Sequence, residues 1–463
     1  MKKKFLYSVY FFLSFLLVAQ SDPLFSQLKS GFLSHDVELQ KLQLAYEKAL
    51  LEYAQTKVQE GLDVAFQTGG MKIVQEENGL QFSLSPSIKF SLPFVQNSAI
   101  TFSVPMEIAK NNLLYDRAGV FFSFDIFSST QKERIISLNK AERSVLEAER
   151  AIIARKKVAE KEFLSLIKNL YEQQETIFSF FDDYYEQEQT METLKIQGYI
   201  PTSARYRTQE LNLKKYSWEI EKAENDFRLS LEEFSRKCGV SLESLDFIIP
   251  TEKIEIFSNY TLENFIDYEK TVWNYGIKKL TREAKKDFSL GFSGGYAYTK
   301  DSTKEKNALA TEIGGSYKGL DFSTGVDIPL DGTMPEYSLS FGINWGEFKK
   351  NTLEKKDAQL SEQLDLVNMA QAKTNFSDFM QDKELEAKNL LWVGKNYQEQ
   401  LSLYEDLYKE SEKWFAQGII SEKEMRQAKT NYYQAQNKVK LHQVDILLFN
   451  LSFKEKFLDS KEK

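Results

Sequence analysis

Few side chains in this sequence are of the types that carry out chemistry. The single cysteine, Cys238, precedes Gly239 at an expected helix end and has no partner for an internal disulfide. The two histidines, His35 and His442, are far apart and have no ligand-like neighbours. The sequence contains no nucleophile elbow, phosphate loop, CxxC pair or zinc-type spacing. We therefore expect no catalytic residue, no cofactor and no metal site, and we interpret Cys238 as a buried structural thiol.

Charge does not point to an enzyme or to nucleic acid either. Acidic pairs are abundant, but on long helices such pairs are usually solvated faces. The 68 acidic and 60 basic side chains give a formal net charge of −8, and the basic residues are dispersed along the chain. This pattern lacks the basic patch that a nucleic-acid partner requires.

The distribution of helix breakers predicts two very long helices. No Gly or Pro lies between Gly119 and Gly198, and no Pro follows Pro335. We expect helices over about 129–197 and 347–417, each about 70 residues and roughly 100 Å long. A helix of that length has no core of its own, so its apolar stripe must be covered by neighbouring helices.

Two blocks of the chain alternate apolar and polar residues with a period of two, which predicts strands. They run over about 62–127 and 288–345, and each contains four alternating segments separated by turn signals. Strands with one apolar and one polar face suit a sandwich, or a barrel with lipid outside and water inside. The aromatic richness of these segments favours the transmembrane barrel.

The same order of elements occurs twice, which indicates an internal duplication. Gln197-Gly198-Tyr199-Ile200 and Gln417-Gly418-Ile419-Ile420 each follow a long helix and open another amphipathic one. We predict a first unit over 22–239, with its helical hairpin over about 129–239. A connector over 240–260 runs along the outside of the helices. A second unit covers 261–463, with a hairpin over about 347–457. The helix that opens the first unit is expected over about 31–60.

The N-terminus has the parts of a signal peptide over residues 1–21. Lys2 to Lys4 are cationic, Phe5 to Val18 are apolar, and small residues follow up to Ser21. The apolar run is about 14 residues, short of the roughly 20 that a membrane-spanning helix needs. We predict cleavage near Ser21–Asp22 and export of the mature chain; a retained anchor is the alternative.

The two glycine turns and the helices after them resemble the TolC-like outer-membrane efflux family. The resemblance is carried by the residues from Gln197 to Thr202 and from Gln417 to Glu422, and extends over about residues 22–457. Each motif is weak alone, and the duplicated order is the specific signal.

The resemblance implies an α+β membrane protein that acts as a homotrimer. Three copies share one transmembrane β-barrel in the outer membrane and one periplasmic α-helical, coiled-coil barrel. It implies passive export of small molecules or polypeptides, in a tripartite efflux or type I secretion system. Gly198, Tyr199, Gly418 and Ile419 then contact a periplasmic adaptor, which links to an inner-membrane pump. The alternative is a secreted or periplasmic coiled-coil structural or adhesive protein without a pore.

Two departures from the family pattern qualify these expectations. Glu424 matches an acidic position at the family's tunnel entrance, but Gln427 stands where a second acid is expected, and Ile420 replaces a basic partner. The family contributes two strands per half, whereas each half here has four alternating segments. The extra segments could form a surface hairpin, belong to long interrupted strands or widen the barrel; Pro86, Pro93 and Pro105 favour the hairpin or loop.

Overall fold

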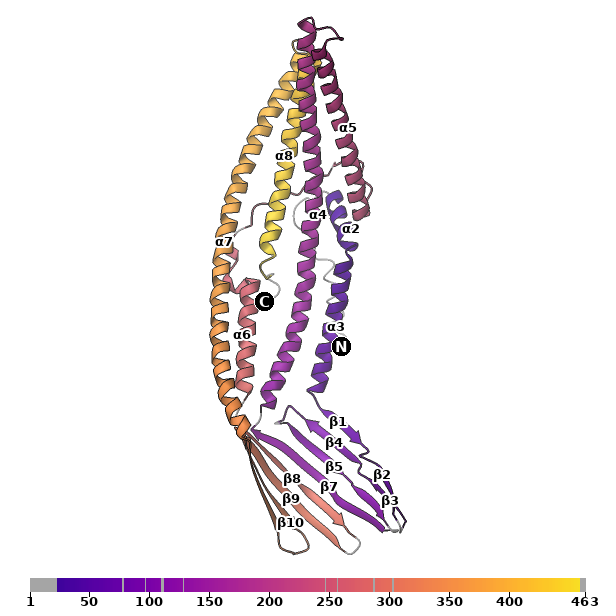
Figure 1. The fold of residues 1–463 in the computed structure, drawn as a ribbon, viewed down its shortest axis with the longest axis vertical. Helices are drawn as coiled ribbons and strands as arrows, with labels where there is room; N and C mark the ends of the chain where they lie inside the picture. The colour runs from indigo at the N-terminus through magenta and orange to yellow at the C-terminus, as the bar shows by residue number, and fades with distance from the viewer. Residues whose placement is uncertain are drawn as a thin grey trace. The chain divides into compact units, whose positions relative to one another are not determined.

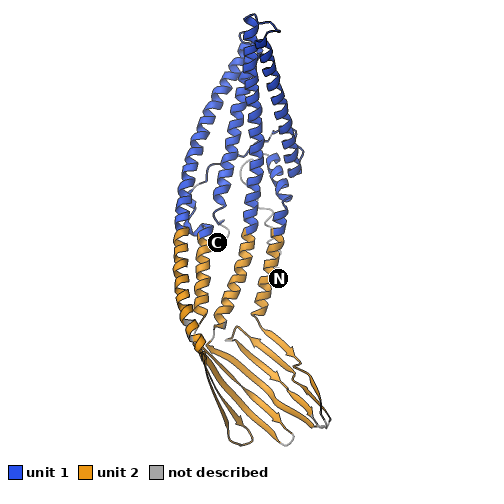
Figure 2. Ribbon diagram, viewed as in Figure 1, with its two compact units in different colours: residues 1–41, 151–267, 373–463 blue, residues 42–150, 268–372 orange. Residues whose placement is uncertain are grey.

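The structure is a computed structural model, and it describes residues 23–76, 79–95, 97–109, 112–127, 129–245, 247–255, 257–285, 288–301 and 304–458. The predicted signal peptide, residues 1–21, lies outside the described residues. Contacts between residues divide the chain into two units (Figure 2). Unit 1 comprises residues 1–41, 151–267 and 373–463, and unit 2 comprises residues 42–150 and 268–372.

Helices and strands follow one another in the same general order in both halves of the chain (Figure 1). The first half contains α2 (Pro23–Ser34), α3 (Val37–Gln59), β1 (Asp63–Gln67), β2 (Lys72–Glu76), β3 (Gly79–Leu84), β4 (Ser87–Leu92), β5 (Ser98–Ser103), β6 (Met106–Ala109), β7 (Asn112–Phe127), α4 (Thr130–Ile196) and α5 (Ala204–Cys238). After two short 3₁₀ turns, the second half contains α6 (Ile266–Ala284), β8 (Phe288–Lys300), β9 (Glu305–Tyr317), β10 (Leu320–Pro329), β11 (Glu336–Ile343), α7 (Trp345–Ala416) and α8 (Glu422–Lys454). The two long predicted helices are α4, with 67 residues, and α7, with 72, although α7 contains Gly346 and Gly394.

The core of unit 1 lies between helices. It joins buried side chains of α2, α4, α5 and α8, such as Leu28, Phe163, Phe234 and Val444. The segment between α5 and α6 contributes Leu245, Phe247 and Ile249, which are at most 5% exposed. The connector therefore packs these three side chains against the helices. They cover apolar surface that the four helices leave open.

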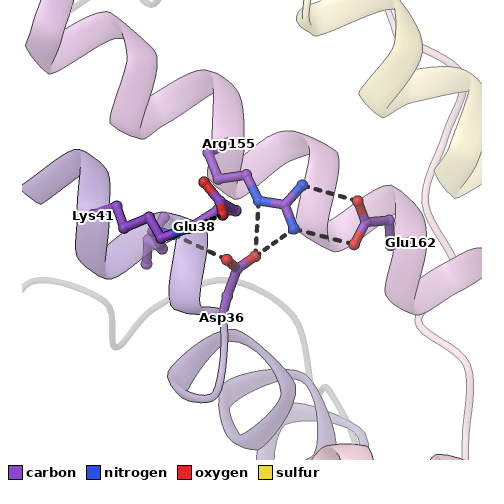
Figure 3. A network of polar contacts seen from close by, with 6 residues as sticks. Asp36, Glu38, Lys41, Arg155 and Glu162 are labelled. Atoms are coloured by element: carbon purple, nitrogen blue, oxygen red, sulfur yellow. Dashed lines mark hydrogen bonds and ion pairs between the residues drawn. The ribbon is translucent and has the colours of Figure 1, made fainter.

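The predicted first helix is in fact two helices, because Asp36 starts a new one. Oδ1 of Asp36 accepts a hydrogen bond from the backbone amide of Leu39 at 2.9 Å, as an N-cap residue does. Its other oxygen accepts from Arg155 of α4, whose Nε lies 2.9 Å and Nη2 2.7 Å away (Figure 3). Arg155 also donates to both carboxylate oxygens of Glu162, at 2.9 and 3.2 Å. This network fixes the break between α2 and α3 against α4.

The strands that the structure describes in unit 2 form one antiparallel sheet. Its strands lie in the order β1-β4-β5-β7-β8-β9-β10-β11, and β2, β3 and β6 pair beside this path. β7 and β8 join the two halves of the chain over ten paired positions, from Tyr115 opposite Lys300 to Phe127 opposite Leu290. The alternating segments predicted in both halves are therefore strands of one sheet.

Pro86 and Pro105 interrupt strands rather than separating a hairpin from the sheet, whereas Pro93 lies in the turn that follows β4. Pro86 falls between β3 and β4, and Pro105 falls between β5 and β6, yet β4 pairs with β5 and β3 pairs with β6. Since proline lacks the N–H that a ladder needs, each proline interrupts the ladder, but the pairing continues beyond it in the same register, with Ser87 opposite Ser103 and Leu84 opposite Met106. Of the three possibilities for the extra segments, the interpretation as a separate surface hairpin was wrong.

Ion pairs hold the helical parts of unit 2 together. Arg143 of α4 is only 6% exposed and donates to both oxygens of Glu269 of α6, at 2.5 and 2.9 Å. Lys278 and Arg282 of α6 reach Asp365 of α7 at 2.6 and 3.2 Å. Both carboxylates are mostly buried, and each accepts from two cations, which satisfies the buried charge.

Candidate functional site

The turn after α4 requires glycine. Gly198 has φ = +78°, and its amide donates to the carbonyl of Lys195 at 3.0 Å, while the amide of Tyr199 donates to Leu194 at 3.1 Å. These two bonds are those of a Schellman motif, in which a left-handed residue satisfies the last carbonyls of a helix. Nothing lies within 4 Å of a Cβ built at Gly198, so the backbone conformation alone demands glycine there.

The turn after α7 has the same geometry. Gly418 has φ = +70°, its amide donates to Phe415 at 2.9 Å, and the amide of Ile419 donates to Trp414 at 2.9 Å. Space around a Cβ at Gly418 is again open. The two glycines that the sequence singled out thus occupy equivalent backbone positions.

Both turns lie at the same end of unit 1 (Figure 1). Lys423, just after the second turn, places its Nζ 3.8 Å from a carboxylate oxygen of Glu192, in the last two turns of α4. Apolar side chains stand in solvent beside these turns: Ile196 is 87% exposed, Ile200 62% and Ile419 64%. These three isoleucines are exposed apolar side chains next to the two chain reversals.

Tyr199 is held in place by Arg205 of α5. The guanidinium donates to the Tyr199 hydroxyl at 3.0 Å and lies 5.6 Å from the ring centroid. These two contacts restrain the half-buried ring.

Glu424 closes the start of α8 through a capping box with Ser421. The Glu424 carboxylate accepts from the Ser421 amide at 2.7 Å and from its hydroxyl at 2.9 Å, and the Ser421 hydroxyl accepts from the Glu424 amide at 3.3 Å. The bonds from the Ser421 backbone and hydroxyl hold the pKa of the Glu424 carboxyl below its ordinary value. Glu424 is exposed, and Gln427, one turn further along α8, is half-buried. The Ser-x-x-Glu spacing is a helix-start signal that the sequence analysis did not use.

The sheet has two faces of opposite character. In each row given below, every residue lies directly opposite the next one on the neighbouring strand. An unbroken row of exposed apolar side chains crosses seven strands from β1 to β10, and every member is at least 38% exposed: Phe66, Ile88, Phe102, Val120, Tyr296, Leu309 and Ile328. We call this side of the sheet the apolar face. A row on the opposite side crosses all eight strands of the main path with small or polar residues: Asp63, Ser91, Ala99, Ser123, Ser293, Glu312, Gly325 and Ser338.

We call this second side the small-residue face. It is hollowed where Ser91, Ser123, Ser293 and Glu312 lie. A sheet packed on a protein core would bury its apolar face, whereas here the apolar face is the exposed one. This arrangement suits lipid on one side and water on the other.

The cysteine and the two histidines, whose side chains are of types that can carry out chemistry, are buried or hydrogen-bonded within the fold. Cys238 is 1% exposed, and burial raises the pKa of its thiol to about 12, so the thiolate is suppressed at neutral pH. His35 Nδ1 lies 2.7 Å from the carbonyl oxygen of Gly31. Burial lowers the pKa of His442. Within the described ranges, no three His, Cys, Asp or Glu side chains are arranged to hold a metal ion. None of the helices that the structure describes is both long and apolar enough to cross a membrane.

Two family models match the chain in sequence. The model described as the TP096X N-terminal domain matches residues 28–252, and that of the TP096X C-terminal domain matches residues 250–460. An uncharacterized protein of Treponema pallidum (strain Nichols) is 22% identical over 453 residues, which cover 94% of this chain and 82% of the relative.

Two solved structures share the fold. CusC, studied for conformational changes during folding and transmembrane channel formation, aligns with a TM-score of 0.51 at 11% identity over 95% of this chain and 94% of its own. The outer membrane protein VceC from Vibrio cholerae aligns with a TM-score of 0.50 at 11% identity over 93% and 94%. The expectation of a sheet combined with long helices, in the arrangement of such channel proteins, is confirmed at the level of the fold.

Proposed function

We propose that this protein is the outer-membrane duct of a tripartite efflux or type I secretion system. In this proposal three copies share a transmembrane barrel built from the sheets, and the helices of unit 1 build a periplasmic tunnel. The observation that carries it is the two-faced sheet, whose exposed apolar row crosses seven strands while small and polar residues line the opposite side. The fold shared with CusC and VceC supports the same conclusion.

The duct performs no chemistry in this account. It holds open a water-filled path for small molecules or polypeptides, and a pump in the inner membrane supplies the energy. The two halves of the chain, 22–239 and 261–463, then derive from a duplicated unit, and signal-peptide cleavage near Ser21 precedes assembly.

The glycine turns are the proposed contact with a periplasmic adaptor. Gly198 and Gly418 let both helical hairpins reverse at one end of unit 1, where Ile419 is exposed and Tyr199 is restrained by Arg205. A rigid turn that presents apolar side chains loses little conformational entropy on binding. Glu424 is exposed and charged at neutral pH, and we place it, with Gln427 beside it, at the tunnel entrance, as the family resemblance implies.

Release of entrapped solutes from proteoliposomes tests the proposal. Vesicles that contain the purified protein should release small dyes without any energy source, and dyes above a size limit should be retained. Vesicles that bind the protein but stay sealed to every dye would favour the non-porous coiled-coil alternative.

A further inference from the structure

The main path of the sheet ends in two strands that have a free edge. Among the described strands, β1 pairs only with β4, and β11 pairs only with β10. Each outer edge therefore presents a row of backbone N–H and C=O groups without a ladder partner. In lipid, such groups cost several kcal/mol each unless another strand satisfies them.

Neither edge strand contains lysine or proline. Proteins protect edges with charged side chains, proline or bulges, but the only charged residue in each strand is the first one, since β1 reads Asp-Val-Ala-Phe-Gln and β11 reads Glu-Tyr-Ser-Leu-Ser-Phe-Gly-Ile. On β11, Leu339 is 85% and Tyr337 78% exposed, about twice the value of Phe102 inside the sheet, at 43%. The edges are thus built to be covered.

The two edges fit each other in direction and in face. Eight strands on the main path are joined by seven antiparallel pairings, so β1 and β11 run in opposite directions. Asp63 of β1 and Ser338 of β11 belong to the same cross-sheet row, and Val64 and Tyr337 lie on the apolar face. Placed side by side, the strands would continue both the antiparallel ladder and the two faces.

Closure of one chain on itself is disfavoured by the size of the side chains. An eight-stranded barrel is just wide enough for its inward side chains to fill it. Here the small-residue face offers mainly glycine, alanine and serine, for example Ala99, Ser293 and Gly325. Such a face would leave a narrow barrel unfilled, whereas a wide barrel with a water-filled interior needs no filling.

We infer that β1 of one copy pairs with β11 of the next, so that each copy supplies eight strands to a shared barrel. The inference rests on the proposed function and extends it, because the family resemblance implies four strands per copy. In a trimer the barrel has 24 strands, which places it among the wide transmembrane barrels with an open lumen. Selection by size then occurs in the helical tunnel and not in the sheet.

Disulfide cross-linking tests the edge pairing. Ala65→Cys on β1 is combined in the full-length protein with Ser338→Cys, Ser340→Cys or Gly342→Cys on β11, which all lie on the small-residue face. Directly opposed residues have Cα atoms about 4.5–5.5 Å apart, within disulfide reach. The matched control combines Ala65→Cys with Leu339→Cys, whose side chain lies on the apolar face. Native Cys238 is buried and stays in place.

Oxidation in membranes should link copies into covalent dimers and closed rings when both cysteines lie on the small-residue face (a same-face pair). At least one of the three same-face pairs should form these links, and the control pair should not. Dye-releasing vesicles in which no same-face pair links copies would overturn the edge pairing and leave the duct intact. A faster-migrating single chain, from a bond within one copy, would also overturn it. Linked copies in vesicles that stay sealed would support the pairing and contradict the proposed function.

Discussion

A lysine placed on the apolar face should weaken membrane insertion strongly, while a lysine one residue away should not. Ile313 lies on the apolar face of β9, 39% exposed, between Phe292 of β8 and Thr324 of β10. It is two residues from the middle of this strand, or about 7 Å along it. Near the bilayer centre, a lysine on the lipid side costs about 2–4 kcal/mol. The Ile313→Lys substitution should thus weaken insertion by roughly 30- to 700-fold per chain.

Glu312→Lys is the matched control. Residue 312 belongs to the small-residue face and already carries a charge, so lysine there should meet water and leave insertion within about twofold. The assay is the fraction of refolded protein that floats with lipid vesicles across a urea series. Equal losses in the two variants would refute the assignment of lipid to the apolar face, and a larger loss in Glu312→Lys would reverse the faces.

Three further predictions concern the helical part of the protein. Gly198→Val and Gly418→Val should each lower the free energy of unfolding by about 1–2 kcal/mol because φ is positive there. Both substitutions should impair export without preventing assembly. The control is Gly276→Ala, in open space on α6, which should be neutral or stabilising. Asp36→Asn should destabilise the protein by about 1–3 kcal/mol at neutral pH. Although burial opposes it, the hydrogen bonds from Arg155 and the backbone lower the pKa of Asp36, so this difference should persist above about pH 4 and fade in denaturant titrations at lower pH. Glu424→Gln should reduce cation preference in single-channel recordings; unchanged selectivity would leave Glu424 with its capping role alone.

The elements with strict periodicity were predictable from sequence. Strands such as β9 alternate side chains between two environments, and a period of two records that alternation directly. Gly198 and Gly418 were predictable for a different reason, because a long helix that ends at a glycine reports a positive φ. The small-residue face was also predictable, because small residues alternate with aromatic residues along the strands.

Features that depend on single side chains or on distant partners could not be predicted from the sequence. The break at Asp36 follows from an N-cap whose second carboxylate oxygen binds Arg155, 119 residues away. Leu245, Phe247 and Ile249 are buried by four separate helices, and no local pattern signals that surface. Pro86 and Pro105 favour a hairpin or loop in the sequence, but the strands on either side keep their places in the sheet because β7 pairs with both β5 and β6.

The conductance of the purified protein in a planar lipid bilayer, with the mass of the particle determined in parallel, tests the central claim most directly. The account predicts particles of three copies that insert and give discrete, passive channel steps. A folded protein that never inserts, or that inserts without conducting, would contradict a duct and leave a helical scaffold as the function.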